Sequence, residues 1–398
     1  MNPILEKLVQ IGKKDSKIIL GLMSGTSMDG LDVALCKFIG SGTDTQVEIL
    51  QFESVPFDEA FKKKVRTIFA KEEIHFPELS TLNVEVAQKH ASIVNDLLQK
   101  WNIENDSVDV IASHGQTVMH RPMRDHSRPH STIQIGDGDH LAYQTGIITL
   151  SDFRQKHIAA GGEGAPLAVF GDYLLFSQKS ENRILLNIGG IGNFTYIPGD
   201  LDPHAIRVTD TGPGNTLIDA LVRRYFPAQS FDKDAAIANK GKVSEDLLHL
   251  ILKDDFFKEN FPKSTGPEKF NLDWLNKIML DGNIHLSPED LICTISELTA
   301  RSISDAINQY LHIDNTYPTR LLISGGGSNN PFIMKRLSEL NPNFNCEDFD
   351  VLGFDSGAKE AVLFALLANE TLSDATVYKN RKLGDTPWPS LGKISLPL

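Results

Sequence analysis

Short apolar runs with the character of β-strands alternate with segments of helical periodicity along the whole chain. In the first half, residues 17–38 form two apolar runs around a polar, glycine-rich turn, which predicts two strands joined by a hairpin. A third strand is expected next, and two segments with apolar residues at helical spacing follow it. We expect strands at 17–38, 45–57, 109–117, 132–136 and 146–153, and helices at 57–70 and 79–101. This alternation is typical of an α/β fold.

The second half repeats this order. Residues 183–197 are again two apolar runs around a glycine-rich turn, and residues 205–215 predict a third strand. A further strand at 319–330 leads into a helix at 331–340. Two more helices are expected in this half, at 216–224 and 288–311.

The repeat predicts two duplicated domains on either side of a central cleft. The equivalent turns at Gly25 and Gly190 and the equivalent strand ends at Ser113 and Ser324 are spaced differently, which implies an insertion in the second half. The polar, charge-rich stretch Phe226–Asn283 fits that insertion. We expect the first domain to comprise residues 1–155 with the tail 372–398, and the second domain to comprise residues 156–371.

Composition then narrows the classes of function. At 398 residues the chain is too long for one ordinary core, and its net charge of −13 disfavours nucleic acid as a partner. No apolar run approaches the roughly 20 residues of a membrane-spanning helix, and the charged N-terminal residues indicate a short helical extension. The three cysteines, Cys36, Cys293 and Cys346, lie far apart in sequence. Reduced thiols suit them best, so a cytoplasmic location is expected.

The first glycine-rich turn, MSGTSMDG, carries the strongest candidate chemistry. Gly25 and Gly30 allow close backbone approach, and Ser24, Thr26 and Ser27 add hydroxyl groups. The acidic residue of the turn, Asp29, could coordinate a magnesium–phosphate complex directly or through water. An ordinary hairpin turn has a similar composition, but the position directly after a buried strand favours a phosphate-binding loop.

Two further glycine clusters extend this prediction. NIGGIGNF contains Gly189, Gly190 and Asn193, and is weak evidence alone because glycines are common in turns. Paired with the first turn it predicts a two-sided phosphate clamp. SGGGSNN, with glycines at 325, 326 and 327, ends a strand and opens a helix, where a phosphate or a flat base could lie on bare backbone.

Asp210 is the candidate catalytic carboxylate. It lies in RVTDTGPGN, at the end of an expected strand, where α/β proteins place their chemistry. A base at this position could take a proton from an attacking water or hydroxyl. An Asx-turn or a helix-capping aspartate is an equally good interpretation of this segment by itself.

Two other strand ends are unusually polar. ASHGQT contains His114, Gln116 and Thr117, and SDFRQKHIAAGGEGAPL contains Asp152 and Arg154. Such donors and acceptors suit a sugar, which needs many short-range hydrogen bonds. The alternatives are a structural histidine at 114 and a surface ion pair for Asp152 and Arg154.

Taken together, these segments closely resemble the anhydro-N-acetylmuramic acid kinases, a family within the sugar kinase, heat-shock chaperone and actin superfamily. The resemblance extends over nearly the whole chain and is carried by these motifs: GLMSGTSMDGLDVAL, SHGQT, SDFR, GGEGAPL, LNIGGIGN, DTGPGN, KSTGPEKFNL, SGGGSNNP and LGKIS. It implies two ribonuclease H-like domains with the actin-like ATPase fold.

The resemblance also implies a reaction. Members of that family use water to open the 1,6-anhydro bridge of anhydro-N-acetylmuramic acid and phosphorylate O6 with ATP, in recycling of the bacterial cell wall. Asp210 matches the catalytic aspartate, and Mg²⁺ is expected to arrive with ATP, so no metal ligand is assigned beyond the candidate Asp29. The residues expected to bind the nucleotide are Gly25, Thr26, Ser27, Met28, Asp29, Gly30, Leu31, Asp32, Gly189, Gly190, Asn193, Gly325, Gly326 and Gly327. Those expected to bind the sugar are Thr117, Asp152, Arg154, Gly212, Asn215 and Glu360.

Two departures and two alternatives stay open. Glu163 stands where glutamine is expected, and FDSGAK precedes Glu360 in place of a proline-containing form. A levoglucosan-type kinase acts on a simpler sugar with the same bridge, and an actin-like or chaperone-like ATP-binding protein would perform no sugar chemistry. The expected partner is a small anhydro amino sugar, without nucleic acid or membrane, and a homodimer stays open.

Overall fold

A computed structural model describes residues 2–122, 128–313, 316–354, 357–373 and 382–397. The chain divides into two compact units, Met1–Phe176 with Gly357–Leu398, and Ser177–Ser356. Among the described residues, no helix is long and apolar enough to cross a membrane.

The first unit is built on a seven-stranded mixed sheet within the described residues. Its strands are β1 (Ser16–Ser24), β2 (Gly30–Ile39), β3 (Gln46–Pro56), β4 (Val110–Arg121), β5 (Ser131–Ile135), β6 (Thr149–Ser151) and β14 (Lys393–Ser395). Their order is β14-β6-β4-β1-β2-β3, and β5 pairs with β4. The β1–β2 and β2–β3 pairs are antiparallel, whereas β4 runs parallel to both β1 and β6.

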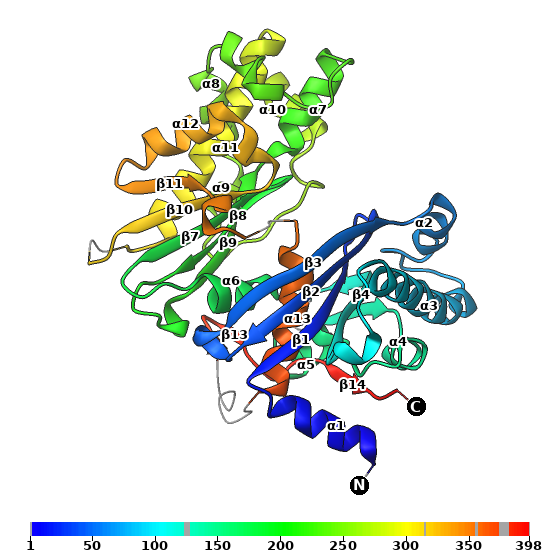
Figure 1. Ribbon diagram of the computed structural model, residues 1–398. Coiled ribbons are helices and arrows are strands. Elements are labelled where there is room, and N and C mark those ends of the chain that lie inside the picture. The colour runs from blue at the N-terminus through cyan, green and yellow to red at the C-terminus, as the bar shows by residue number, and fades with distance from the viewer. Residues whose placement is uncertain (1, 123–127, 314–315, 355–356, 374–381, 398) are drawn as a thin grey trace. The chain divides into compact units, whose positions relative to one another are not determined.

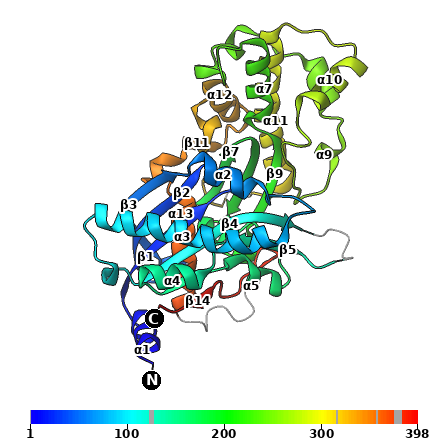
Figure 2. The ribbon, with the colours of Figure 1, turned by 90° about the vertical axis from the view of Figure 1, so that its right-hand side faces the viewer.

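Helices cover both faces of this sheet (Figures 1 and 2). The helices of this unit, within the described residues, are α1 (Pro3–Gly12), α2 (Glu59–Arg66), α3 (Phe76–Lys100), α4 (Gly138–Thr145), α5 (Phe153–Ala159), α6 (Ala168–Phe176) and α13 (Lys359–Leu372). On one face α3 packs against Leu20 and Leu22 of β1. On the other face α13 approaches so closely that a Cβ atom on Gly21 would lie 1.9 Å from the carbonyl oxygen of Ala361. Because glycine has no side chain, the backbone of α13 can lie directly against β1 at this position.

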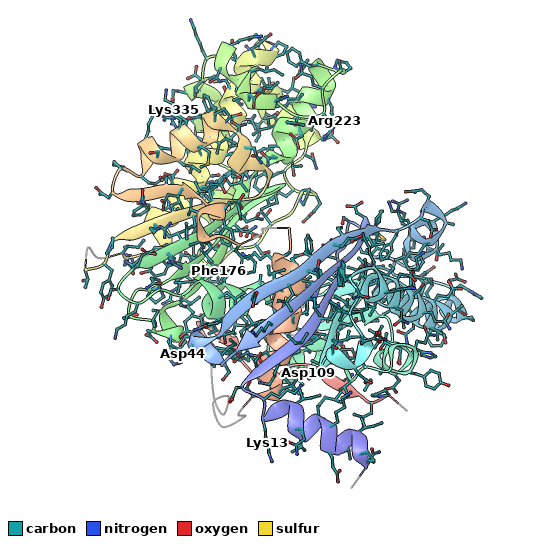
Figure 3. The ribbon with its side chains drawn as sticks, in the orientation of Figure 1. Lys13, Asp44, Asp109, Phe176, Arg223 and Lys335 are labelled. Atoms are coloured by element: carbon teal, nitrogen blue, oxygen red, sulfur yellow. The ribbon has the colours of Figure 1, made fainter. Side chains whose placement is uncertain are left out.

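The helical extension expected at the N-terminus is confirmed as α1, and it is tied to the first sheet. Asn2 caps α1 by accepting a hydrogen bond from the backbone N–H of Ile4. Asp109, just before β4, binds Lys14 at 2.5 Å and accepts a hydrogen bond from the N–H of Ile18 in β1 (Figure 3). This carboxylate fixes the end of β1 that lies away from the glycine-rich turn.

Within its described residues, the second unit has a five-stranded sheet that repeats the β6-β4-β1-β2-β3 order of the first. Its strands are β7 (Asn182–Ile188), β8 (Ile191–Ile197), β9 (Arg207–Pro213), β10 (Thr319–Ser324) and β11 (Phe344–Asp348). The order is β11-β10-β7-β8-β9, with β7–β8 and β8–β9 antiparallel and β10 parallel to both β7 and β11. Each unit thus contains a three-stranded antiparallel meander followed by two parallel strands on the side of its first strand. The duplicated ribonuclease H-like domains are confirmed.

A helical layer packs on the second sheet through one large apolar core (Figure 1). Its helices are α7 (Asn215–Tyr225), α8 (Glu245–Ile251), α9 (Asp255–Lys258), α10 (Leu272–Asp281), α11 (Pro288–Tyr310) and α12 (Pro331–Leu340). The expected insertion, Phe226–Asn283, contains α8, α9 and α10. Short elements complete the described chain: β12 (Lys382–Leu383), β13 (Thr386–Pro387), and 3₁₀ turns at Gly42–Asp44, Asn105–Ser107, Pro203–Ala205, Lys233–Ala235, Ala238–Lys240, Gly326–Asn329 and Phe349–Leu352.

The unit boundaries differ from those expected at residues 155/156 and 371/372. Residues 156–176 and 357–371 belong to the first unit. The cause is packing: α13 lies on β1, and Gly171 of α6 faces Leu363 of α13, where a Cβ atom would meet the leucine at 2.8 Å. Part of the expected C-terminal tail, residues 374–381, lies outside the described residues.

Candidate functional site

The β1–β2 turn presents its polar groups and buries its apolar ones. Thr26, Ser27 and Asp29 are exposed, whereas Met28 and Leu31 lie in the core of the first unit. Met28 has a positive φ of 58°, and its N–H donates to the carbonyl oxygen of Gly25 at 3.2 Å. The side chains of Met28 and Leu31 therefore anchor the turn, and these two residues can meet a ligand only through their backbone.

Gln116 on the neighbouring strand β4 fixes the start of this turn. Its side-chain oxygen accepts a hydrogen bond from the Ser24 hydroxyl at 2.5 Å, and its amide donates to the carbonyl oxygens of Gly25 and Thr117 at 3.1 Å each. Both Ser24 and Gln116 are buried. Polar side chains buried in this way hold a single arrangement because each broken bond would leave an unpaired group.

Arg154 is joined to the same turn through His114. Its Nε donates to Nε2 of His114 at 2.9 Å, and Nδ1 of His114 lies 3.3 Å from the carbonyl oxygen of Ser24. Because Nε2 accepts, the imidazole proton lies on Nδ1 and points to Ser24. Burial and the nearby Arg154 charge lower the pKa of His114 to about 3, so the ring stays neutral. A second arginine nitrogen, Nη1, donates to Gly164 at 2.8 Å.

The other sugar candidates of the first unit have distinct surroundings. Asp152 forms an ion pair with Lys393 of β14, so the surface pair considered for Asp152 and Arg154 is wrong. Thr117 is buried and its hydroxyl accepts a hydrogen bond from Gln134 at 3.1 Å. Glu360, at the start of α13, remains accessible to solvent.

Glu360 lies in the electric field of charged groups from three elements. Partial desolvation raises the pKa of its carboxyl group, and the negative charge of Asp32 raises it further. Arg154 and Lys359 oppose this shift. Of the two departures, Glu163 is exposed, and residues 355–356 of FDSGAK lie outside the described residues.

In the second unit the β7–β8 turn and the start of α7 form one structure. The carbonyl oxygen of Gly190 accepts from the N–H of Gly214 and from the Thr216 hydroxyl, at 2.9 Å each. Asn215 donates its N–H to the carbonyl oxygen of Gly189 at 2.8 Å and its side-chain amide to that of Ile188 at 3.1 Å. The side-chain NH₂ of Asn215 is therefore engaged by the turn.

The third glycine cluster joins the same end of β7. Gly325 follows β10 with φ 83° and ψ 174°, and a Cβ atom there would lie 2.6 Å from Oδ1 of Asn187 and 2.7 Å from the carbonyl oxygen of Ile188. A Cβ on Gly327 would clash with Ile188 as well. The predicted residues Gly189, Gly190, Asn215 and Gly325–Gly327 thus come together at the carboxyl ends of two parallel strands.

Asp210 lies in β9, opposite Asn193 of β8 and beside a bulge at Gly192. Gly212 follows it with a φ of 139°. The Asp210 carboxylate accepts a hydrogen bond from the N–H of Thr265 at 2.8 Å and another from the Ser264 hydroxyl. Burial raises the pKa of Asp210, and these two hydrogen bonds oppose the rise. A half-buried carboxylate of this kind can act as a general base near neutral pH.

Sequence reasoning did not predict the supporting roles of several residues around these sites. The segment Lys263–Thr265 holds Asp210 although it lies in the insertion, and Gln116 and His114 hold the first turn. Polar residues inside the buried strand β4 were a usable signal for the latter pair. For Ser264 and Thr265 only the hydroxyl-rich composition of KSTG gave a hint. No group of three or more His, Cys, Asp or Glu side chains suited to a metal ion occurs among the described residues.

Comparison with known proteins decides the family. The sequence pattern described as "Anhydro-N-acetylmuramic acid kinase" matches residues 17–395. The chain belongs to the anhydro-N-acetylmuramic acid kinase family. A member from Pseudoalteromonas atlantica is 48% identical over 406 residues, covering 100% of both chains. One from Caldanaerobacter subterraneus is 37% identical, covering 98% of this chain and 100% of the relative. Both relatives carry the name anhydro-N-acetylmuramic acid kinase.

Membership of the anhydro-N-acetylmuramic acid kinase family makes the chain an ATP-dependent sugar kinase. The family match begins at residue 17, so α1 lies before the matched region, and it ends at β14. The glycine-rich turns, Asp210 and Arg154 all fall inside it.

Proposed function

We propose that this chain phosphorylates anhydro-N-acetylmuramic acid at O6 while opening its 1,6-anhydro bridge, and so forms N-acetylmuramic acid 6-phosphate and ADP. The observation that carries this proposal is the family match over residues 17–395 together with near-full-length relatives of that name. The reaction consumes one ATP and one water per sugar. It belongs to the recycling of peptidoglycan fragments.

Asp210 acts as the general base. It takes a proton from a water molecule, whose oxygen then bonds to the anomeric carbon as the bond from that carbon to O6 breaks. The freed O6 attacks the γ-phosphorus of ATP, and ADP leaves. The hydrogen bonds from Thr265 and Ser264 support this role because they favour the charged carboxylate over its protonated form.

The glycine-rich turns bind the nucleotide. In the β1–β2 turn (Gly25–Asp32), backbone N–H groups and the exposed hydroxyls of Thr26 and Ser27 are available to phosphate oxygens. The other residues assigned to the nucleotide are Gly189, Gly190, Asn193 and Gly325–Gly327, of which the glycines offer backbone without a side chain. Asp29 is exposed and could hold Mg²⁺, which would neutralise charge that develops on the transferred phosphoryl group.

The residues assigned to the sugar are Arg154, Thr117, Glu360, Asp152, Gly212 and Asn215. Arg154 is the best supported of these, because His114 and Gly164 fix the orientation of its guanidinium group. We place the reaction in the cytoplasm, where ATP is available and where the free thiols of Cys36, Cys293 and Cys346 would stay reduced. A homodimer is compatible with this proposal.

A lysine at position 154 cannot form both hydrogen bonds of the arginine. We expect Arg154→Lys to raise KM for the sugar about 10- to 100-fold, with little change in KM for ATP. Steady-state kinetics with each substrate varied in turn measures both constants. Arg320→Lys is the matched control. Arg320 lies at the start of β10, away from the glycine cluster that follows this strand, and it pairs with Glu347 and Glu181. Equal sugar KM in the two variants would exclude Arg154 from the sugar site.

The pH dependence follows from Asp210. Its raised pKa means that the catalytic carboxylate is lost to protonation at a pH above the ordinary range of an aspartate. We expect kcat/KM to rise with pH through this pKa and then to level off. His114 stays neutral throughout, because its pKa is about 3, and contributes no step near pH 6.5. A pH–rate profile from pH 4 to 9 tests both statements, and a step that disappears in His114→Asn would contradict the second.

A panel of sugars tests the proposed substrate. Anhydro-N-acetylmuramic acid, levoglucosan, N-acetylmuramic acid and N-acetylglucosamine are each supplied with ATP, and ADP release is measured. We expect the anhydro muramic sugar to have the highest kcat/KM. A preference for levoglucosan would replace the proposed substrate, and ADP release that no sugar stimulates would support an ATP-binding protein without sugar chemistry.

A further inference from the structure

Lys263 is a buried cation enclosed by aromatic rings. It lies in the insertion, between α9 and α10, and its relative exposure is only 8%. Its Nζ lies 4.5 Å from the ring centres of both Phe256 and Phe261 and 5.9 Å from that of Phe257. The same atom donates a hydrogen bond to the carbonyl oxygen of Phe256 at 3.0 Å.

This ammonium group has no ion-pair partner within the described residues. Other lysines of the insertion form ion pairs: Lys269 with Asp254 at 2.9 Å, and Lys258 with Asp255 at 3.4 Å. Burial lowers the pKa of Lys263, while Glu259 raises it. Burying a cation without a carboxylate is costly, and aromatic rings offset part of that cost. Because Lys263 is buried, its charge does not serve to keep the protein surface soluble, and the residue needs another explanation.

The backbone of Lys263 joins the edge of the catalytic strand. Its N–H donates to the hydroxyl oxygen of Thr209 at 3.0 Å, and its carbonyl oxygen accepts the N–H of Asp210, also at 3.0 Å. Among the described residues β9 is the outermost strand of its sheet, so the backbone of Asp210 faces no further strand on that side. Lys263 therefore supplies one backbone hydrogen bond of the kind that a further strand would give.

The two residues after Lys263 bind the Asp210 side chain. Thr265 N–H donates to Oδ2 at 2.8 Å, and the Ser264 hydroxyl forms the second hydrogen bond. One short segment thus contacts both the backbone and the carboxylate of Asp210. The direction in which the carboxylate points depends on where this segment is held.

We propose that the aromatic enclosure of Lys263 is an anchor that positions the segment Lys263–Thr265, and through it the Asp210 carboxylate. Lys263 is a positioning residue, because its charged end faces the phenylalanine rings. The inference rests on the proposed function, in which Asp210 is the general base. It gives the insertion a role: Phe256, Phe257 and Phe261 affect the pKa and the orientation of the carboxylate on β9.

Lys263→Met tests the anchor, because methionine keeps an apolar stem among the rings and removes the charge and the hydrogen bond to Phe256. We expect kcat to fall about tenfold and the acid limb of the pH–rate profile to move up by about one pH unit, since Asp210 would lose donors that favour its charged form. KM for ATP should stay unchanged. Lys269→Met is the matched control: Lys269 lies 5.6 Å from the same Phe256 ring but pairs with Asp254. Its acid limb should not move.

Ser264→Ala provides a second route, because it removes one hydrogen bond to Asp210 and leaves the enclosure intact. We expect a smaller shift of the acid limb in the same direction. The pKa of Asp210 is also read directly, by carbon NMR titration of labelled aspartate, independently of turnover. An unchanged pKa in Lys263→Met, alongside a shifted pKa in Ser264→Ala, would overturn the anchor. Full turnover in Asp210→Asn would instead remove Asp210 as the general base, on which the inference rests, so the two failures are distinguishable.

Discussion

Replacing Asp210 by asparagine should lower sugar phosphorylation about a thousandfold while leaving ATP binding intact. Asparagine has the same shape and can still accept the hydrogen bond from Thr265 N–H through its side-chain oxygen. It cannot accept a proton from water, and a positioned general base typically contributes a factor of about 10² to 10⁴. Turnover is measured with saturating ATP and sugar, and nucleotide affinity by calorimetric titration.

Asp219→Asn is the matched control for this variant. Asp219 lies on α7 in the same unit, and burial raises the pKa of its carboxyl group as it does for Asp210. It has no part in the proposed chemistry, so its variant should stay within about twofold of the wild type. Near-normal turnover in Asp210→Asn would remove this aspartate from the mechanism.

The second large effect is expected at Gly325. Its backbone conformation, with φ 83° and ψ 174°, is essentially restricted to glycine, and an alanine there costs about 1–3 kcal/mol in strain alone. The added methyl group would also press on Asn187 and Ile188, at the end of β7 where the second glycine turn begins. We expect Gly325→Ala to raise KM for ATP at least about tenfold and to lower the melting temperature.

Gly353→Ala is the control that separates backbone strain from a clash of the added methyl group with its neighbours. Gly353 also has a positive φ, 68°, but a methyl group there would meet no atom of the described residues within 4 Å. This control should lose about 1 kcal/mol of stability and keep its KM for ATP. If the two variants have the same KM for ATP, the third glycine cluster is not part of the nucleotide site.

Much of the fold was predictable because local patterns decide it. The turn between β1 and β2, and the bounds of α11 and α12, follow from apolar periodicity and from Ser or Asn caps before proline. Short edge strands gave no such signal: β14 has three residues and β11 is only half-buried. Their position depends on strands elsewhere in the chain.

Unit membership of the last long helix could not be predicted from its own residues. The helix α13 is buried along nearly its whole length, which indicates a core helix but not the sheet that it covers. The deciding contact is between Gly21 and Ala361, two residues far apart in sequence. Its neighbours in sequence do not single out Gly21, although glycine within a strand often marks close backbone approach.

The residues of the candidate site also divide into those that the sequence predicts and those that it does not. Motifs gave the residues that meet ligands in the proposal, because glycine-rich turns and strand-end carboxylates have recognisable sequences. The residues that hold them did not stand out: Lys263 acts on Asp210 from the insertion, and Lys393 pairs with Asp152 from the far end of the chain. Such pairs form through tertiary contacts, and a single sequence does not show which distant residues will meet.

In the proposed reaction, one enzyme adds both water and a phosphoryl group to an anhydro sugar. The most direct measurement is the mass of the product formed from anhydro-N-acetylmuramic acid and ATP. We expect a product heavier than the substrate by one water and one phosphoryl group, formed in equal amount with ADP. A product heavier by the phosphoryl group alone, or ADP formed with free phosphate and unchanged sugar, would contradict the proposed reaction.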